Sequence, residues 1–137
     1  MSQAEAALTA VIGQPSLLYG AGLAATLAVL YLDRPDVIAH DSIYHGGLET
    51  IKLYQRMRGD GQVKVIGLKD DYPKEGKLLV WVETPVNPTG ESTSIQDYAD
   101  KAHKAGGRLL VDSTFAPPTL QDPFKWGADI VLASATK

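Results

Sequence analysis

Short, unbroken apolar runs are the most regular feature of this sequence. The run Leu78–Glu83 (Leu-Leu-Val-Trp-Val-Glu) shows no alternation of apolar and polar residues, and the stretches Arg108–Ala116 and Asp129–Lys137 each contain an apolar strand that ends in polar residues. Strands that are buried on both faces of a parallel sheet have this continuous apolar pattern. Further strands are predicted at Leu17–Tyr19, Val37–Asp41 and Val63–Leu68.

Helical patterns fill the intervals between these strands. Helices are predicted at Gln3–Ile12, with Ala6, Ala7, Ala10 and Val11 on one face, at Thr26–Leu32 and at Leu48–Met57. Ser94 is expected to cap a further helix, with Asp97 at its third position and Gly106 after its end. Strands that alternate with helical crossovers predict an α/β fold with a mostly parallel sheet.

Composition limits the class of protein. The 137 residues are 45% hydrophobic and 21% charged, which is typical of one soluble globular domain. A net charge of -3 without a basic run predicts that neither nucleic acid nor an anionic membrane is a partner. No segment has the apolar length that crosses a bilayer, and the first residues lack the basic and then apolar order of a signal peptide.

Cysteine and histidine usage bears on redox compartment and metals. The absence of cysteine excludes disulfides and thiolate metal sites and fits a reducing compartment, so we expect a cytoplasmic protein. His40, His45 and His103 have no third donor at ligand spacing. No metal site is therefore expected.

Two reactive side chains lie at the ends of the last two strands. Asp112 and Lys137 are expected to face one crevice, because open α/β sheets place their ligands beyond the carboxyl ends of the strands. A carboxylate can keep a pyridine nitrogen protonated, a lysine amine can form a Schiff base with an aldehyde, and the hydroxyls of Ser134 and Thr136 can donate to phosphate. Pyridoxal phosphate combines these three groups and is the cofactor that the pattern favours. A surface lysine and a strand-end aspartate would explain either residue taken alone.

Three further segments fall where a ligand could bind. The glycine turn Gly20–Ala25 opens a helix whose first N–H groups are free, as at many phosphate sites. Tyr44 lies in the loop after a strand, although a plain loop aromatic gives the same pattern. Thr84–Gly90 contains two prolines and Asn87, which predict a rigid turn. Glu83, directly before this turn, is either a satisfied strand-end carboxylate or a group that orients Asn87.

Five collinear segments carry a resemblance to one enzyme family. They are Gly22–Ala25, Asp41–Gly46, Val80–Pro88, Leu110–Ala116 and Gly127–Lys137. In these segments the chain resembles the trans-sulfuration enzymes of Cys/Met metabolism, which include cystathionine γ-synthase, cystathionine γ-lyase and methionine γ-lyase. The resemblance spans nearly the whole chain in the family's order. It implies the large cofactor-binding domain of fold type I (aspartate-aminotransferase-like) pyridoxal-phosphate enzymes.

The resemblance implies a role for each candidate residue. It makes Lys137 the Schiff-base lysine and the later proton shuttle, and Asp112 the partner of the pyridine nitrogen. Tyr44 corresponds to the aromatic that stacks on the cofactor ring, and Asn87 to the donor to its phenolic oxygen. The phosphate group would be bound by the backbone amides of Gly22 and Leu23 and by the hydroxyls of Ser134 and Thr136.

The implied activity is that of a carbon–sulfur lyase or a γ-substitution transferase. Its substrates would be sulfur amino acids or O-acylhomoserine-type compounds, and the family implies a homotetramer built as a dimer of dimers. Residues 1–137 would correspond to part of the large cofactor-binding domain. The family's N-terminal arm and C-terminal domain have no counterpart in this sequence, so we expect the isolated chain to be inactive.

The chain departs from the family's pattern at three sites. Ala21-Gly22-Leu23 stands where Ser-Gly-Met is usual, which removes one hydroxyl contact but keeps the backbone amides. Ser113 follows the aspartate where asparagine is common. His45 is inserted between Tyr44 and the glycines, a variant similar to fungal-type synthases.

Other functions remain open at this point. Gly20-x-Gly22-x-x-Ala25, followed by Asp41 at the end of the next strand, has the spacing of a dinucleotide-binding fingerprint. Ser134-x-x-Lys137 has the spacing of a serine-hydrolase motif, which requires a helix that carries both residues. A third alternative is a non-enzymatic remnant that pairs with a longer paralogue.

Overall fold

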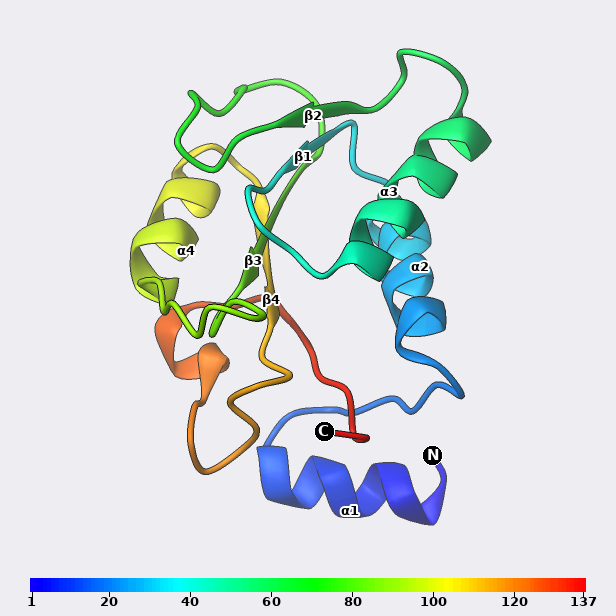
Figure 1. Ribbon diagram of the computed structural model, residues 1–137, viewed down its shortest axis with the longest axis vertical. Coiled ribbons are helices and arrows are strands. Elements are labelled where there is room, and N and C mark those ends of the chain that lie inside the picture. Colours follow the sequence, from blue (N-terminus) through cyan, green and yellow to red (C-terminus); the bar gives the residue numbers. More distant parts are fainter.

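A five-stranded parallel sheet in the order β2-β1-β3-β4-β5 runs through the middle of the structure (Figure 1). The computed structural model describes residues 1–137. Its strands are β1 (Val37–Ala39), β2 (Lys64–Ile66), β3 (Leu78–Glu83), β4 (Arg108–Asp112) and β5 (Ile130–Leu132). Its helices are α1 (Gln3–Ile12), α2 (Gly22–Asp33), α3 (His45–Arg58), α4 (Ile95–Lys104) and the short 3₁₀ helix η1 (Pro123–Trp126). The predicted α/β fold with a parallel sheet and helical crossovers is confirmed.

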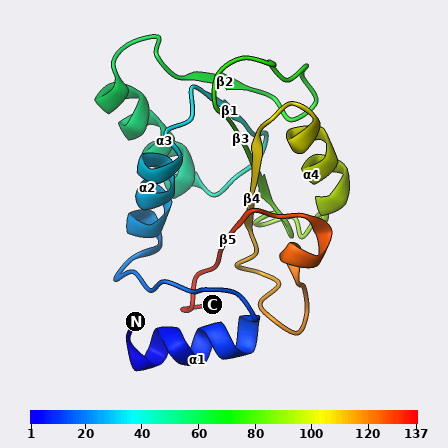
Figure 2. The same cartoon turned by 180° about the vertical axis from the view of Figure 1, so that it is seen from behind.

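Helices cover both faces of the sheet. Helices α2 and α3 lie on one face, whereas α4 and η1 lie on the other (Figures 1 and 2). Alternate residues of β3 therefore enter different cores: Leu79 and Trp81 pack with α2 and α3, while Val80 and Val82 pack with α4. All six residues of β3 are buried, which explains its unbroken apolar sequence.

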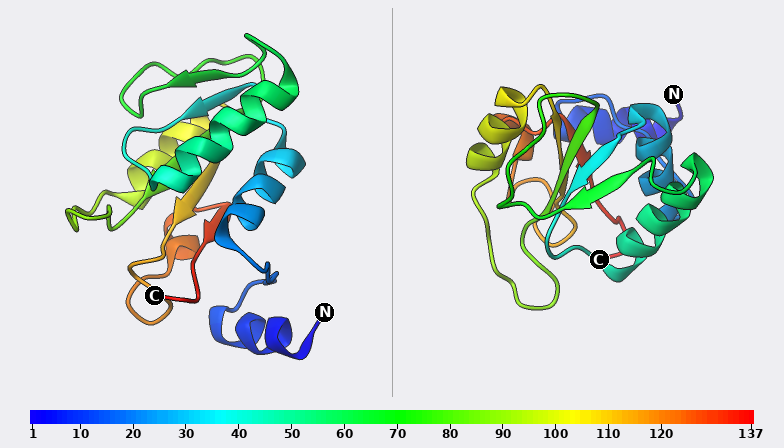
Figure 3. Two further views of the ribbon diagram at one scale, coloured as in Figure 1. Left: turned by 45° about the vertical axis from the view of Figure 1, so that its right-hand side comes forward. Right: turned by 90° about the horizontal axis from the view of Figure 1, so that it is seen from above.

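The first helix differs from its prediction. The expected face of Ala6, Ala7, Ala10 and Val11 is exposed, and the partly covered side is formed instead by Glu5, Leu8, Thr9 and Ile12. Helix α1 contains no buried residue and lies apart from the sheet (Figure 3). A capping box between Ser2 and Glu5 defines its start, and Gly13 in a left-handed conformation ends it.

The predicted strand Leu17–Tyr19 is wrong. This segment is irregular and exposed, with 73% of Leu17 accessible to solvent. The Leu18 N–H donates to the side chain of Glu5 in α1, at 3.1 Å, instead of to a neighbouring strand. Three apolar residues indicate burial only when a sheet lies beside them, and here none does.

The third helix starts earlier than predicted, at His45. Gly46 and Gly47 in its first turn lower helix propensity, which is why the sequence suggested a later start. Both are needed for close packing: an added Cβ would lie 3.2 Å from the Trp81 ring at Gly47 and 2.5 Å from the Tyr44 ring at Gly46.

A hydrogen-bonded network closes the amino edge of the sheet. The buried Tyr54 hydroxyl donates to the Pro35 carbonyl at 3.1 Å and accepts from Arg58 at 2.7 Å. The second guanidinium nitrogen of Arg58 donates to Asp36 Oδ1 at 3.0 Å, and the Lys77 N–H donates to Asp36 Oδ2 at 3.0 Å. Asp36 thereby joins the start of β1, the end of α3 and the segment that leads into β3.

Substitution of Asp36 by asparagine is expected to lower stability in a pH-dependent way. The Lys77 N–H bond, followed by Arg58, lowers the pKa of Asp36 below 3.8. A lowered folded-state pKa means that the stabilisation is fully present above 3.8 and is lost as pH falls through the folded pKa. We expect a loss of about 1 kcal/mol or less at neutral pH, because the carboxylate is partly exposed.

Urea unfolding at neutral and acidic pH measures this effect. The difference between the Asp36→Asn variant and the parent chain should narrow as the medium is acidified. Asp71→Asn, an exposed aspartate in the connection before β3, is the matched control and should show no such difference. A loss of equal size at every pH would contradict the role of the charge.

Candidate functional site

The predicted site residues follow four adjacent strands. Tyr44 lies beyond β1, Asn87 beyond β3, and Lys137 beyond β5, while Asp112 is the last residue of β4. Because the strands are parallel, all four segments leave the sheet at the same edge (Figure 3). The carboxyl edge therefore gathers residues that are up to 93 positions apart in the sequence, from Tyr44 to Lys137.

Asp112 is half-buried and uses only one carboxylate oxygen within the chain. Its Oδ1 accepts from the Thr114 N–H at 3.0 Å and from the Thr114 hydroxyl at 2.6 Å. These bonds fix the orientation of the carboxylate and leave Oδ2 available. An oriented carboxylate with one free oxygen is suited to bind a protonated ring nitrogen.

Thr114 also connects β4 with the end of the chain. Its hydroxyl accepts from the Ser134 N–H at 3.0 Å, and the Ser134 and Thr136 hydroxyls are 2.9 Å apart. The Lys137 amine donates to the Thr136 hydroxyl at 3.2 Å. A continuous series of contacts therefore leads from the Asp112 carboxylate to the Lys137 amine, although Thr136 and Lys137 themselves are exposed.

Thr114 was missed by sequence reasoning. The signal was available, because an aspartate commonly accepts from the backbone N–H two residues later and the spacing Asp112-x-Thr114 allows that turn. The second bond, from the hydroxyl, and the contact with Ser134 depend on where β5 lies. Sequence spacing alone does not supply that position.

The side chains of Tyr44 and of Leu23, in the first turn of α2, both pack against Gly46. An added Cβ on Gly46 would lie 2.5 Å from Tyr44 Cε1 and 2.7 Å from Leu23 Cδ2, so both side chains rest against this glycine. Tyr44 is 55% exposed, so much of the residue is accessible to a ligand. Gly46 thus brings the loop after β1 next to the start of α2.

The amino end of α2 offers free backbone donors. Its N-cap residue, Ala21, provides no side-chain bond, and the first intrahelical contacts are made by Ala24 and Ala25. The Gly22 and Leu23 N–H groups therefore precede the helical ladder. A Cβ on Gly22 would meet no atom within 4 Å, so the space before the helix is open. Such an end can accept an anion.

Glu83 connects two of the loops at this edge. Its carboxylate accepts from the Asn87 N–H at 2.9 Å with one oxygen and from the Tyr44 N–H with the other. Burial raises the pKa of Glu83; the two N–H donors oppose this, and the charge of Asp112 adds to it. The expected contact between Glu83 and Asn87 is present at the Asn87 backbone, and the orientation of the Asn87 side chain stays a prediction. The turn beyond it contains cis bonds before Pro85 and Pro88.

The donor set at this edge is chemically suited to pyridoxal phosphate. Asp112 could bind the ring nitrogen, Tyr44 could stack on the ring, and the Lys137 amine could react with the aldehyde. The phosphate could be bound by the N–H groups of Gly22 and Leu23 together with the hydroxyls of Ser134 and Thr136.

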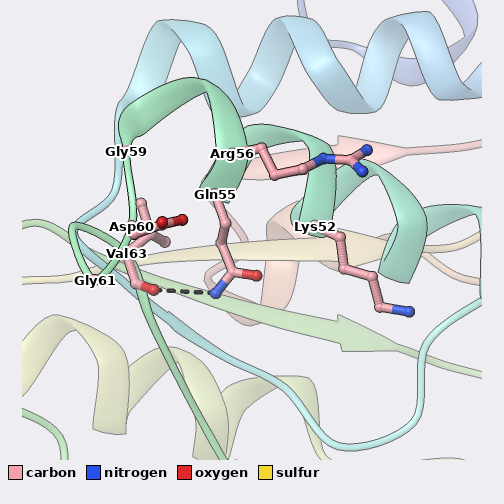
Figure 4. A pocket seen from close by; sticks show the side chains of 7 residues that line it. All are labelled: Lys52, Gln55, Arg56, Gly59, Asp60, Gly61 and Val63. Atoms are coloured by element: carbon pink, nitrogen blue, oxygen red, sulfur yellow. Dashed lines mark hydrogen bonds between the residues drawn. The ribbon is translucent and has the colours of Figure 1, made fainter.

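A hollow on the surface lies away from these residues. It has a volume of about 410 Å³ and is lined by Lys52, Gln55, Arg56, Gly59, Asp60, Gly61 and Val63 (Figure 4). The Gln55 amide donates to the Val63 carbonyl across it at 3.0 Å. Val63 precedes β2, so the hollow belongs to the opposite, amino edge of the sheet.

The secondary structure that two alternative interpretations require is absent. The glycine fingerprint at Gly20–Ala25 requires a preceding strand of the sheet, and Leu17–Tyr19 is irregular. The Ser134-x-x-Lys137 pattern requires a helix, and the residues after β5 are not helical. No group of three or more histidine or acidic side chains could hold a metal ion, and no helix is both long and apolar enough to span a membrane.

The parallel α/β sheet is that of the fold type I class of pyridoxal-phosphate enzymes. The chain belongs to the family described as Cys/Met metabolism PLP-dependent enzyme, which it matches over residues 3–137. The family resemblance found in the sequence is confirmed, and with it the family's cofactor, pyridoxal phosphate.

Individual relatives include a lyase and a sulfhydrylase. Cystathionine gamma-lyase from Saccharomyces cerevisiae is 36% identical over 133 residues, which cover 90% of this chain and 34% of the relative. O-succinylhomoserine sulfhydrylase from Pseudomonas aeruginosa is 39% identical over 100 residues, covering 64% of this chain and 24% of the relative. The structure of metB from Corynebacterium glutamicum has a TM-score of 0.81 and 30% identity over 97% of this chain and 37% of that one. The chain spans about a third of the length of the curated relatives that it matches.

Proposed function

We propose that this chain forms the cofactor-binding part of a pyridoxal-phosphate-dependent carbon–sulfur lyase or γ-substitution transferase of trans-sulfuration. The substrates would be sulfur amino acids or O-acylhomoserine-type compounds. The observation that supports this proposal most directly is the series of contacts that joins Asp112, through Thr114, Ser134 and Thr136, to Lys137. It links the carboxylate and the amine that such chemistry requires.

Each residue in this proposal has a defined task. Pyridoxal phosphate, when bound, supplies an electron sink for negative charge that develops on the substrate. Asp112 would hold a proton on the ring nitrogen, and Tyr44 would cover one face of the ring. The Lys137 amine would hold the cofactor and would take and return a proton as a general base.

The proposal also covers the cellular location and the oligomeric state of the protein. A chain without cysteine suits the reducing cytoplasm, and family resemblance supports a homo-oligomer of paired subunits. The acidic net charge of -3 supports the expectation of small-molecule substrates over nucleic-acid or membrane partners.

Borohydride trapping tests the cofactor site. The purified chain is incubated with pyridoxal phosphate and reduced, and the pyridoxyl adduct is mapped by peptide mass spectrometry. We expect the adduct at Lys137, with its loss in Lys137→Ala. Lys125, which is 77% exposed, serves as an internal control for non-specific labelling. Equal labelling of Lys125 and Lys137 in a folded chain would refute the proposed site.

A further inference from the structure

Glu83 is a carboxylate in an unusual position. It is the last residue of the central strand β3, and only 4% of it is exposed. It pairs in register with Asp112 on β4, so two acidic residues stand side by side at the carboxyl edge of the sheet. Burial of a carboxylate beside another one is costly unless hydrogen bonds compensate for the lost water.

The compensation comes entirely from backbone N–H groups. No lysine, arginine or histidine forms a salt bridge with Glu83. One oxygen accepts from the Asn87 N–H, four residues away, and the other accepts from the Tyr44 N–H, 39 residues away. A single side chain therefore connects the loop after β1 with the turn after β3.

Only an ionised glutamate offers an acceptor oxygen to each of the two N–H groups at this position. A glutamine would turn an amide N–H toward one of the two backbone N–H groups, and two donors cannot bond to each other. An aspartate is one methylene shorter and cannot span the same distance. A protonated glutamate would also present a donor at one oxygen.

We propose that Glu83 is a positioning residue, which sets the location of Tyr44 relative to Asn87 so that the two close on one cofactor ring from different loops. This inference rests on the proposed function, because that function supplies the cofactor that the two loops would both contact. It adds to the site a group that contacts neither the cofactor nor the substrate. Its effect is transmitted through the Tyr44 and Asn87 backbones.

Amide hydrogen exchange in the cofactor-free chain tests the positioning directly. In Glu83→Gln we expect the Tyr44 or Asn87 N–H to exchange at least about ten-fold faster than in the parent chain, since one bond is lost. The Val82 and Val111 amides, in the buried strands, should keep their rates. Glu91→Gln, the same substitution at an exposed position after the same turn, is the matched control. Parent-like rates at both Tyr44 and Asn87 would overturn the inference.

The parent chain provides a second measurement should Glu83→Gln fail to fold. Proton NMR shifts of the Tyr44 and Asn87 amides, followed against pH, should show one shared midpoint above 4.5, because both N–H groups bond to the same carboxylate. Asp112 on β4 is the charged group whose field acts on Glu83, so the titration is repeated in Asp112→Asn, where the shared midpoint should move down. Different midpoints at the two amides in the parent chain would refute a common carboxylate.

Cofactor titration separates this inference from the proposed function. Glu83→Gln should need about ten-fold more pyridoxal phosphate than the parent chain or Glu91→Gln for half-maximal labelling of Lys137. Normal labelling in Glu83→Gln would overturn the positioning role and leave the proposed function intact. A parent chain that binds no cofactor would overturn the proposed function and, with it, any role of Glu83 in that site.

Discussion

Substitution of Asp112 by asparagine is expected to weaken the binding of pyridoxal phosphate about ten-fold or more while the chain stays folded. The amide oxygen of asparagine can still accept from Thr114, so the local turn is retained. The negative charge, which would stabilise a protonated ring nitrogen, is lost. An opposite charge at contact distance shifts a proton affinity by roughly one to three pKa units, which sets the size of the expected effect.

Absorbance titration with pyridoxal phosphate, together with trapping at Lys137, measures this loss. Asp100→Asn removes the same charge from the exposed side of α4 and is the matched control. Circular dichroism of both variants reports on the fold. Equal affinity in Asp112→Asn and Asp100→Asn would show that the Asp112 charge takes no part in binding.

Truncation of Leu110 to alanine should cost about 3 kcal/mol of unfolding free energy. Leu110 is fully buried in β4, where it pairs in register with Trp81 of β3 and Ile130 of β5 on the face that packs against α2 and α3. Removal of a buried leucine side chain loses its transfer free energy and leaves a cavity that rigid neighbouring strands cannot fill. Small domains are stabilised by only about 5–15 kcal/mol, so this is a large share of the total.

Urea unfolding monitored by circular dichroism gives the size of this loss. Leu120→Ala, in the loop after β4, is the matched control because Leu120 is 76% exposed; it should change the stability by less than about 0.5 kcal/mol. A similar loss in both variants would mean that the α2–α3 side of the sheet is not a close-packed core.

The sequence was most informative where burial is greatest. The run Leu78–Glu83 predicted the central strand correctly because both of its faces are covered, so every position had to be apolar except the last. The fold class follows from the alternation of such runs with helices. Leu17–Tyr19 has a similar local composition, but no neighbouring strand pairs with it, and pairing is a tertiary property that three residues do not encode.

The site could be predicted only in part, for a related reason. That Asp112 and Lys137 lie at the same edge could be predicted because each stands at the end of an apolar strand, and parallel strands end at one edge; their roles stay predictions. The connection between them passes through Thr114 and the Ser134 backbone, and it depends on the register of β4 with β5. The prediction of which face of α1 is covered was wrong. Alanines occur on exposed as well as buried helix faces, so their spacing does not show which face packs against the rest of the chain.

The strand order has a consequence for where a ligand can bind at all. From β1 the chain moves outward to β2 on one side and then returns to build β3, β4 and β5 on the other, so the direction of winding reverses between β1 and β3. At such a topological switch point the loops after the two strands lead to helices on opposite faces of the sheet, and open α/β sheets bind ligands in the crevice between such loops. These are the loops that carry Tyr44 and Asn87. The location of the crevice is thus a property of the winding, whereas its selectivity belongs to the loop residues, so loop substitutions can change the ligand without moving the site.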